Sequence, residues 1–305
     1  WDRRAPAPLG TLQLAADQPG RPAVLASMSL RRRIHQSLSR ALLDQGQRDA
    51  LRRLAFNDAG HGFDVLGFDP TAFSTALGVL RFAYERYFRV VSYGAEHLPK
   101  TGAAILAANH GGLLPIDGAM IVADVARRTS PPRVARVIGD IFIPLLPWVG
   151  TTFSRLGVVA GSAGNFRHLL ETGELVLVFP EGVPGIGKGF RKRYELQDWR
   201  VGHAELALRH RVPVIPVAVV GAEEAWPGIG RIDSFHAFGA PFLPIPATPL
   251  PLPVRLHLHY GEPLLLSERF GDADDPTAVR DAARVVKESV QTLISRGLAQ
   301  REGLW

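Results

Sequence analysis

The chain has 305 residues, of which 46% are hydrophobic, enough to bury one large core. It contains no cysteine, which excludes disulfide bonds, thiolate metal sites and a cysteine nucleophile. Its net charge of +6 favours an anionic partner, which could be a membrane surface, a nucleic acid or coenzyme A, and charge alone does not choose between them.

The first part of the chain predicts a loose segment followed by a helical region. Residues 1–27 are rich in Pro, Ala and Gly without a sustained period, so we expect them to be loose. From Met28, apolar residues recur at helical spacing with arginines between them. This pattern suits adsorption to anionic lipid, and equally suits a packed helix with a solvated basic face. The apolar positions are Leu30, Ile34, Leu38, Leu42, Leu51 and Leu54, and the cations include Arg31, Arg32, Arg33, Arg40 and Arg48.

A second helix should start at Asp69 and Pro70, with Asp as N-cap and Pro at the first helical position, and end near Arg89. Residues 88–93 then predict a strand. No window of the chain offers the roughly 18 uncharged apolar residues of a spanning helix.

The window that comes nearest to a spanning helix, 141–154, is short and interrupted by Pro144 and Pro147, so we expect a loop or short helix there. It could dip into a lipid interface or be ordinary core, and its large apolar side chains are Phe142, Leu145, Leu146 and Trp148. Because the chain begins at Trp1 rather than Met, a leader or N-terminal anchor could precede it.

The best candidate for a catalytic base lies at the end of an apolar run. Residues 103–108 predict a short buried strand, which ends at Asn109 and His110 before a Gly-Gly pair. An imidazole at the carboxyl end of such a strand sits where open α/β sheets bind substrates. Asp117 lies seven positions on, where a helical pattern begins. A lone buried His is more often a core residue, so other motifs must support this one.

Two further apolar runs provide that support. Residues 173–182, GELVLVFPEG, predict a strand and a turn that carries Glu181. Residues 212–221, VPVIPVAVVG, predict a strand buried on both faces. Between them, 182–189 nearly spells a phosphate loop, but Gly189 replaces the Ser or Thr that would hold magnesium, so we do not expect nucleotide hydrolysis.

The remaining elements complete an α/β pattern. Residues 133–138 predict a strand, 166–172 and 199–210 predict helices, and His203 should lie on the surface. The Pro-rich stretch 239–253 should be irregular. Residues 254–260 predict a strand, GEPLLL should close the sheet, and a last helix should run from Asp275 to about Arg296. His257 and His259 share a strand face, but no third ligand is apparent, so we expect no metal.

The ordered set of an Asn-His pair with a downstream Asp, a FPEG turn and a VPVIPV strand resembles the phospholipid/glycerol acyltransferase family, which includes the 1-acylglycerol-3-phosphate acyltransferases. The resemblance covers roughly Arg89 to Ser267. In family members, four residues separate the His from the Asp, whereas six residues separate His110 from Asp117 in this chain. This wider spacing is similar to that of a diacylglycerol-acyltransferase-like branch. The family's EGTR turn reads EGVP, with Val183 and Pro184 in place of Thr and Arg, and residues 157–165 lack the phosphate-binding Arg of many members.

The resemblance implies roles for individual residues. His110 would be the general base, and Asp117 would hold its tautomer or cap the following helix. Backbone amides around Gly111 and Gly112 could stabilise the oxyanion, and Glu181 would fix the acceptor or its loop. The other expected substrate contacts are Asn109, Phe179, Pro180, Gly182, Lys188, Arg191 and Arg193. The cations of this loop, Lys188, Arg191, Lys192 and Arg193, would face a phosphate of the acceptor or of coenzyme A, unless they form a solvated basic run.

We therefore predict a single α/β domain with a mixed sheet flanked by helices, divided into a loose segment (1–27), an N-terminal helical region (28–88), an acyltransferase domain (89–270) and a C-terminal helix and tail (271–305). It would move a fatty acyl group from acyl-CoA or acyl carrier protein to a glycerol-based lipid such as lysophosphatidate, without a cofactor and without nucleic acid. A mono- or diacylglycerol acceptor and a non-catalytic lipid-binding protein are the alternatives. A serine hydrolase is not expected, since no G-x-S-x-G occurs. The protein would be peripheral, on the cytoplasmic side of a membrane.

Overall fold

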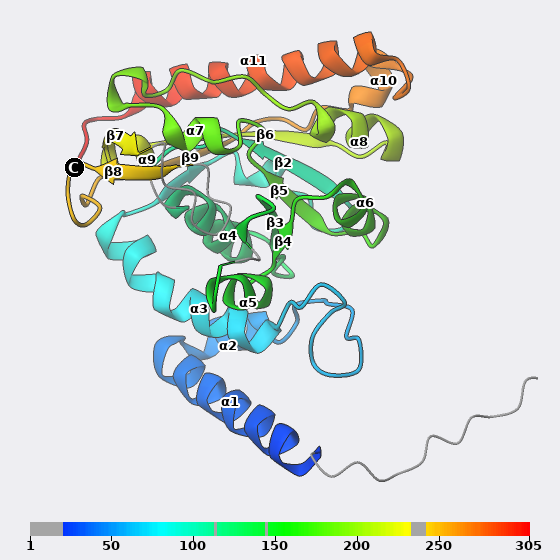
Figure 1. The fold of residues 1–305 in the computed structure, drawn as a ribbon, viewed down its shortest axis with the longest axis vertical. Coiled ribbons are helices and arrows are strands. Elements are labelled where there is room, and N and C mark those ends of the chain that lie inside the picture. Colours follow the sequence, from blue (N-terminus) through cyan, green and yellow to red (C-terminus); the bar gives the residue numbers. More distant parts are fainter. Residues whose placement is uncertain (1–20, 113–114, 144–145, 233–241) are drawn as a thin grey trace, which may run out of the picture.

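A computed structural model describes residues 21–112, 115–143, 146–232 and 242–305, without the side chains of 21–29 and of 31–32. In these residues the strands form a seven-stranded sheet, in the order β1-β9-β6-β2-β5-β3-β4, and a separate pair, β7-β8 (Figure 1). The strands are β1 (Val91–Tyr93), β2 (Ala104–Ala108), β3 (Ala135–Gly139), β4 (Val158–Ala160), β5 (Leu175–Val178), β6 (Val214–Val220), β7 (Gly228–Ile232), β8 (Leu243–Pro246) and β9 (His257–Tyr260).

The sheet is mixed, as predicted. Strands β6, β2, β5, β3 and β4 run parallel to one another. Strand β9 pairs antiparallel with β6 and parallel with β1, so β9 and β1 run in the opposite direction. The carboxyl ends of β2, β5 and β6 therefore meet at one edge, and the predicted site residues follow directly after β2 and β5.

The central strands are buried on both faces because their sequences contain no charged residue. All five residues of β2 are 0% exposed. Alternate residues of β2 point into different cores, with Leu106 in one cluster and Ile105 in the other. This two-sided burial is what a strand covered by helices on both faces requires.

Helices cover the two faces (Figure 1). Their bounds are α1 (Arg21–Leu42), α2 (Gln45–Leu51), α3 (Pro70–Phe82), α4 (Ile116–Arg128), α5 (Val149–Arg155), α6 (Ala163–Glu171), α7 (Val183–Gly187), α8 (Gly202–His210), α9 (Ala222–Ala225), α10 (Leu266–Phe270) and α11 (Pro276–Gln300). Helices α3 and α4 supply residues to the core that contains Leu106. Helices α6, α8 and α11 supply the core that contains Ile105.

Helix α3 begins as predicted, because the Asp69 carboxylate accepts hydrogen bonds from the backbone N–H groups of Thr71 and Ala72. A π-helical turn, Ala83–Tyr87, follows α3. The strand expected at 88–93 is shorter and starts at Val91.

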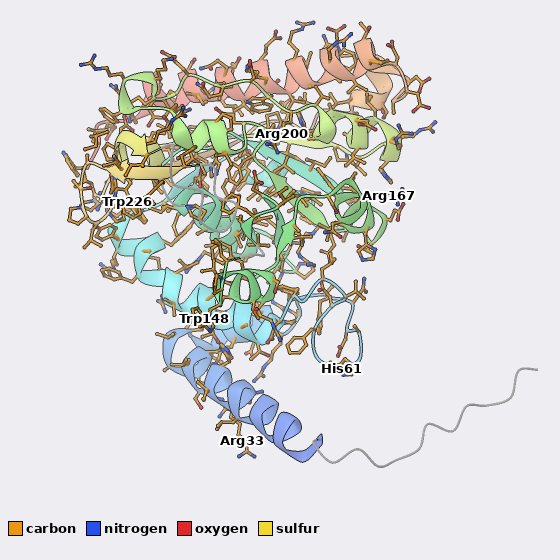
Figure 2. The ribbon with its side chains drawn as sticks, viewed as in Figure 1. Arg33, His61, Trp148, Arg167, Arg200 and Trp226 are labelled. Atoms are coloured by element: carbon orange, nitrogen blue, oxygen red, sulfur yellow. The ribbon has the colours of Figure 1, made fainter. Side chains whose placement is uncertain are left out.

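Helix α1 crosses α3 closely and leaves its apolar stripe in solvent. A Cβ at Gly78 would lie 2.7 Å from Leu42 Cβ, so the small residue permits the close crossing. Leu30, Ile34 and Leu38 are 60%, 50% and 44% exposed. Trp148, which precedes α5, is 88% exposed, and Figure 2 shows it on the half of the molecule to which α1 is attached. Among the described residues, no helix combines the length and the apolarity that crossing a bilayer would require.

Several expectations for the fold are wrong. Helix α1 starts at Arg21, within the segment expected to be loose; the rest of that segment, 1–20, lies outside the described residues. GEPLLL forms no strand: Gly261 donates its N–H to Pro216, and Leu264 makes one bridge to Val214, because Pro263 offers no N–H and α10 begins at Leu266. The stretch expected to be irregular, 239–253, contains β8, and its residues 239–241 lie outside the described residues. Leu145, in the loop that was expected to enter a lipid interface, also lies outside them.

Candidate active site

The chain leaves β2 along a path fixed by Asn109. Its buried side-chain amide donates to the carbonyl of Val219 at 3.1 Å and accepts from the N–H of Val219 at 2.7 Å. Both polar ends of this amide are therefore used by β6. The expected substrate contact of Asn109 is not what the structure shows: Asn109 instead anchors the backbone immediately before His110.

His110 and Asp117 are in direct contact despite their wide spacing. The imidazole Nδ1 lies 2.6 Å from Asp117 Oδ2, and Asp117 is fully buried in the first turn of α4. Asp117 also accepts the N–H groups of Gly111 at 3.0 Å and Gly118 at 2.7 Å. An ionised carboxylate so placed makes Nδ1 the protonated nitrogen, leaving a lone pair on Nε2. This is the arrangement of a histidine held as a base.

The protonation of His110 reflects two opposing effects. Burial by itself lowers the pKa of the imidazole, but the Asp117 carboxylate and, less strongly, Glu181 raise it. The balance leaves the pKa of His110 above its ordinary value of 6.5. Base catalysis by this residue would thus require a pH above that raised value.

The turn after β5 supports the other sides of the imidazole. The Phe179 ring stacks on the His110 ring, with 4.3 Å between their centroids. Glu181, 1% exposed, accepts the N–H of His110 at 3.0 Å and the N–H of Gln197 at 2.9 Å. Glu181 therefore ties the FPEG turn to the histidine and to the segment before α8, which agrees with the expected role of fixing a loop.

Lys188 is not where the sequence placed it. Its side chain is 3% exposed, and its Nζ lies 3.0 Å from Glu223 Oε1 and 3.7 Å from Glu181 Oε2. The structure therefore gives this cation two buried carboxylates as partners, where the sequence suggested a substrate phosphate. Burial raises the pKa of Glu223 to about 7 although Lys188 opposes the shift.

Glu223 explains one of the two glycines after His110. A Cβ at Gly111 would lie 2.3 Å from Glu223 Cγ, closer than any side chain could tolerate. The N–H of Gly111 is occupied by Asp117, so it is not the oxyanion donor expected from the sequence. Gly112, with φ +91°, keeps an N–H that stays a candidate for that role.

The imidazole lines an apolar cavity of about 490 Å³. Ten per cent of the His110 side chain is exposed. The cavity wall is built by α3, α4, β3, the segment before α5 and the FPEG turn, and includes Phe73, Leu80, Val122, Val137, Phe142 and Phe179. A cavity of this size and polarity is typical of a binding site for a small apolar group.

The two predicted arginines lie away from this cavity. Arg193 is placed over the Phe190 ring and 3.9 Å from Glu224 Oε1. Arg191 is exposed and lines neither the apolar cavity nor the neighbouring polar one. That second cavity, of about 630 Å³, is lined by two cations of the predicted run, Lys188 and Lys192, and by Arg200 and Arg231, which were not predicted.

Sequence reasoning missed several of these contacts. His203, expected on the surface, is 4% exposed and lines the apolar cavity, and burial lowers its pKa to about 4. The ion pair between Glu223 and Lys188 was not predicted, because nothing in the sequence connects the two residues. Arg200 carries no motif that would single it out.

Comparisons with known proteins agree on one class. The family model described as "Acyltransferase" matches residues 89–220. An uncharacterized protein of Mycobacterium tuberculosis is 35% identical over 258 residues, which are 80% of this chain and 72% of that protein. A Bos taurus protein named "DGAT1/2-independent enzyme synthesizing storage lipids" is 24% identical over 208 residues, 67% of this chain and 58% of its own length. The crystal structure of the 1-acyl-sn-glycerophosphate (LPA) acyltransferase PlsC from Thermotoga maritima superposes with a TM-score of 0.50 at 18% identity, covering 90% of this chain and 99% of that one.

Proposed function

Because the chain belongs to the acyltransferase family, we propose that it moves a fatty acyl group from a thioester to a hydroxyl of a glycerol-based lipid, with His110 as the general base. The observation that carries this proposal is the 2.6 Å contact between His110 Nδ1 and Asp117 Oδ2 beside an apolar cavity. A protein that only bound lipid would have no need of a buried imidazole paired in this way.

The reaction follows from the geometry. The acceptor hydroxyl gives its proton to His110 Nε2 as its oxygen attacks the thioester carbon, a transfer that typically accelerates such steps 10²–10⁴-fold. Asp117 stabilises the imidazolium that forms. The tetrahedral oxyanion needs an N–H donor, and we assign this role to Gly112. When the C–S bond breaks, the thiolate leaves and takes up the proton.

The apolar cavity suits the fatty acyl chain. Its wall offers aliphatic and aromatic side chains, and His110 lies at the wall, where the thioester carbon must be presented. Burying each methylene there contributes about 0.8 kcal/mol. The donor would be acyl-CoA or acyl carrier protein.

Two acceptors are supported by different observations. The basic lining of the second cavity favours a phosphorylated acceptor such as lysophosphatidate. The name of the bovine relative, which refers to storage lipids, favours a mono- or diacylglycerol.

A membrane surface is the proposed source of the acceptor. Helix α1 presents exposed Leu30, Ile34 and Leu38 beside Arg33 and Arg40, and Trp148 lies on the same half of the protein. Apolar side chains could enter the lipid interface while arginines contact anionic headgroups, each contributing about 1 kcal/mol. The protein would then act as a peripheral membrane enzyme.

The central test replaces the base. With palmitoyl-CoA and either lysophosphatidate or monoacylglycerol, the wild-type protein should form the acylated lipid, identified by mass spectrometry. His110→Ala should reduce transfer about a thousandfold while the thermal transition is retained. His61→Ala, in an exposed loop far from α7, is the matched control and should keep full activity (Figure 2). Near-normal turnover in His110→Ala would show that the assigned base is wrong.

A further inference from the structure

The two cavities beside the FPEG turn differ in character but share part of their walls. The larger is lined by the cations Lys192, Arg200 and Arg231, and the other is mainly apolar and contains His110. Five residues line both cavities, and Arg200 is the cation among them and Asp140 the anion; the others are Ile141, Phe142 and Val183. A substrate with an apolar chain and a charged group could therefore occupy both cavities with its reactive carbon near His110.

Arg200 is held at this junction by its backbone. Its N–H donates to the carbonyl of Pro180 at 3.0 Å, and its carbonyl is 2.9 Å from His203 Nδ1. The guanidinium lies against Gly182, where a Cβ would be 3.4 Å from Arg200 Cζ. Figure 2 shows Arg200 beside α7, which follows this turn. The guanidinium is thus next to the turn that contains Phe179 and Glu181, the two residues that contact His110.

The guanidinium of Arg200 is a charge without a protein counterion. Within the part of the chain that the structure describes, it makes no hydrogen bond and no ion pair. By contrast, Lys188 at the same cavity is neutralised by Glu181 and Glu223. An exposed, uncompensated guanidinium beside an active site is suited to two parallel hydrogen bonds with phosphate oxygens.

Resting on the proposed function, we propose that Arg200 binds the phosphate of a substrate whose reacting group lies at His110. It supplies, from the segment before α8, a cation next to the turn where this chain has Val183 and Pro184. The phosphate belongs to the acceptor lipid or to the coenzyme A of the donor. Both present the same oxygens to the guanidinium, and kinetics distinguish them.

The test compares Michaelis constants in three variants. Arg200→Gln removes the charge, Arg200→Lys keeps it without the bidentate geometry, and Arg167→Gln removes a surface arginine of α6 that is 61% exposed (Figure 2). Each is assayed with palmitoyl-CoA and with lysophosphatidate or monoacylglycerol as acceptor. A lost charge-assisted pair should raise the relevant KM about tenfold or more in Arg200→Gln, with kcat nearly unchanged. Arg200→Lys should recover part of this loss, and Arg167→Gln should match the wild type.

The outcomes separate the possibilities. A higher KM for lysophosphatidate alone assigns the acceptor phosphate, and a higher KM for palmitoyl-CoA with either acceptor assigns the donor phosphate. Unchanged KM values in Arg200→Gln, or an equal fall of kcat in Arg200→Gln and Arg200→Lys without a change in KM, overturn the inference. If the wild-type protein transfers no acyl group to any acceptor, the proposed function itself fails, which is a different result.

Discussion

Replacing Asp117 by Asn tests how the carboxylate acts on His110. The carboxylate contacts His110 Nδ1 at 2.6 Å and accepts two backbone N–H groups, so the substitution keeps the volume but removes the charge and one acceptor. The amide can present its NH₂ to Nδ1, which favours the wrong tautomer. From the analogous change in hydrolytic triads, we expect kcat to fall about 10³–10⁴-fold, or roughly 4–5.5 kcal/mol of transition-state stabilisation.

The pH dependence of kcat/KM provides a second, independent test of how Asp117 acts on His110. In the wild type, Asp117 helps to raise the pKa of His110 above 6.5, and the neutral imidazole is the active form. The rate should therefore fall as the pH drops through that raised pKa. Without the carboxylate, burial lowers the pKa with less opposition, so the acid limb of kcat/KM should move to lower pH even as the maximum falls.

The assay is acyl transfer measured across the pH range below and above 7. Asp124→Asn is a matched control, since Asp124 is a buried carboxylate on the same helix that accepts from Tyr260 at 2.8 Å and Ser92 at 3.0 Å but does not contact His110. It should lower the melting temperature and leave the acid limb in place. An Asp117→Asn enzyme with more than a tenth of the wild-type kcat, or an acid limb shifted upward, would refute the reasoning.

Two further predictions concern the lipid. Val122→Phe should fill part of the apolar cavity and lower kcat/KM for palmitoyl-CoA relative to decanoyl-CoA. The expected loss is about fourfold for each methylene that no longer fits. Equal effects on both donors would show that this cavity does not bind the acyl chain. Replacing Leu30, Ile34 and Leu38 together by Ser should release the protein from phosphatidylglycerol vesicles in a sedimentation assay, and unchanged binding would assign membrane contact to another surface.

The strands were predictable where a long apolar run can only be accommodated in the buried centre of the sheet. Strands β2, β5 and β6 have this pattern, and the structure confirms each of them. Strand β4 was missed because it has only three residues between glycines. The start of α1 was missed because Pro22 looked like a feature of a loose segment, although proline is tolerated in the first turn of a helix. A short apolar pattern next to Pro or Gly therefore does not predict whether the segment forms a strand, a helix or a loop.

The contact between His110 and Asp117 was predictable, and the contacts around it were less so. His110 and Asp117 follow from strand ends and helix starts, which local sequence specifies. The partners of Lys188 do not, because Glu223 is distant in sequence and the pairing depends on how β5 and β6 are ordered in the sheet. A run of cations therefore predicted phosphate contacts, although one cation is neutralised and Arg193 lies beside another carboxylate. The one uncompensated guanidinium that the described residues place beside both cavities lies outside that run.

The position of β9 constrains how the protein can be made on the ribosome. This strand lies between β1 and β6, yet it is among the last parts of the sheet to be synthesised. Until Tyr260 has emerged, the nascent chain has β6 with one unpaired edge and β1 with no neighbour. An open edge of this kind invites pairing with other chains, so release of an incomplete product would favour aggregation even though β2, which precedes His110, is already complete.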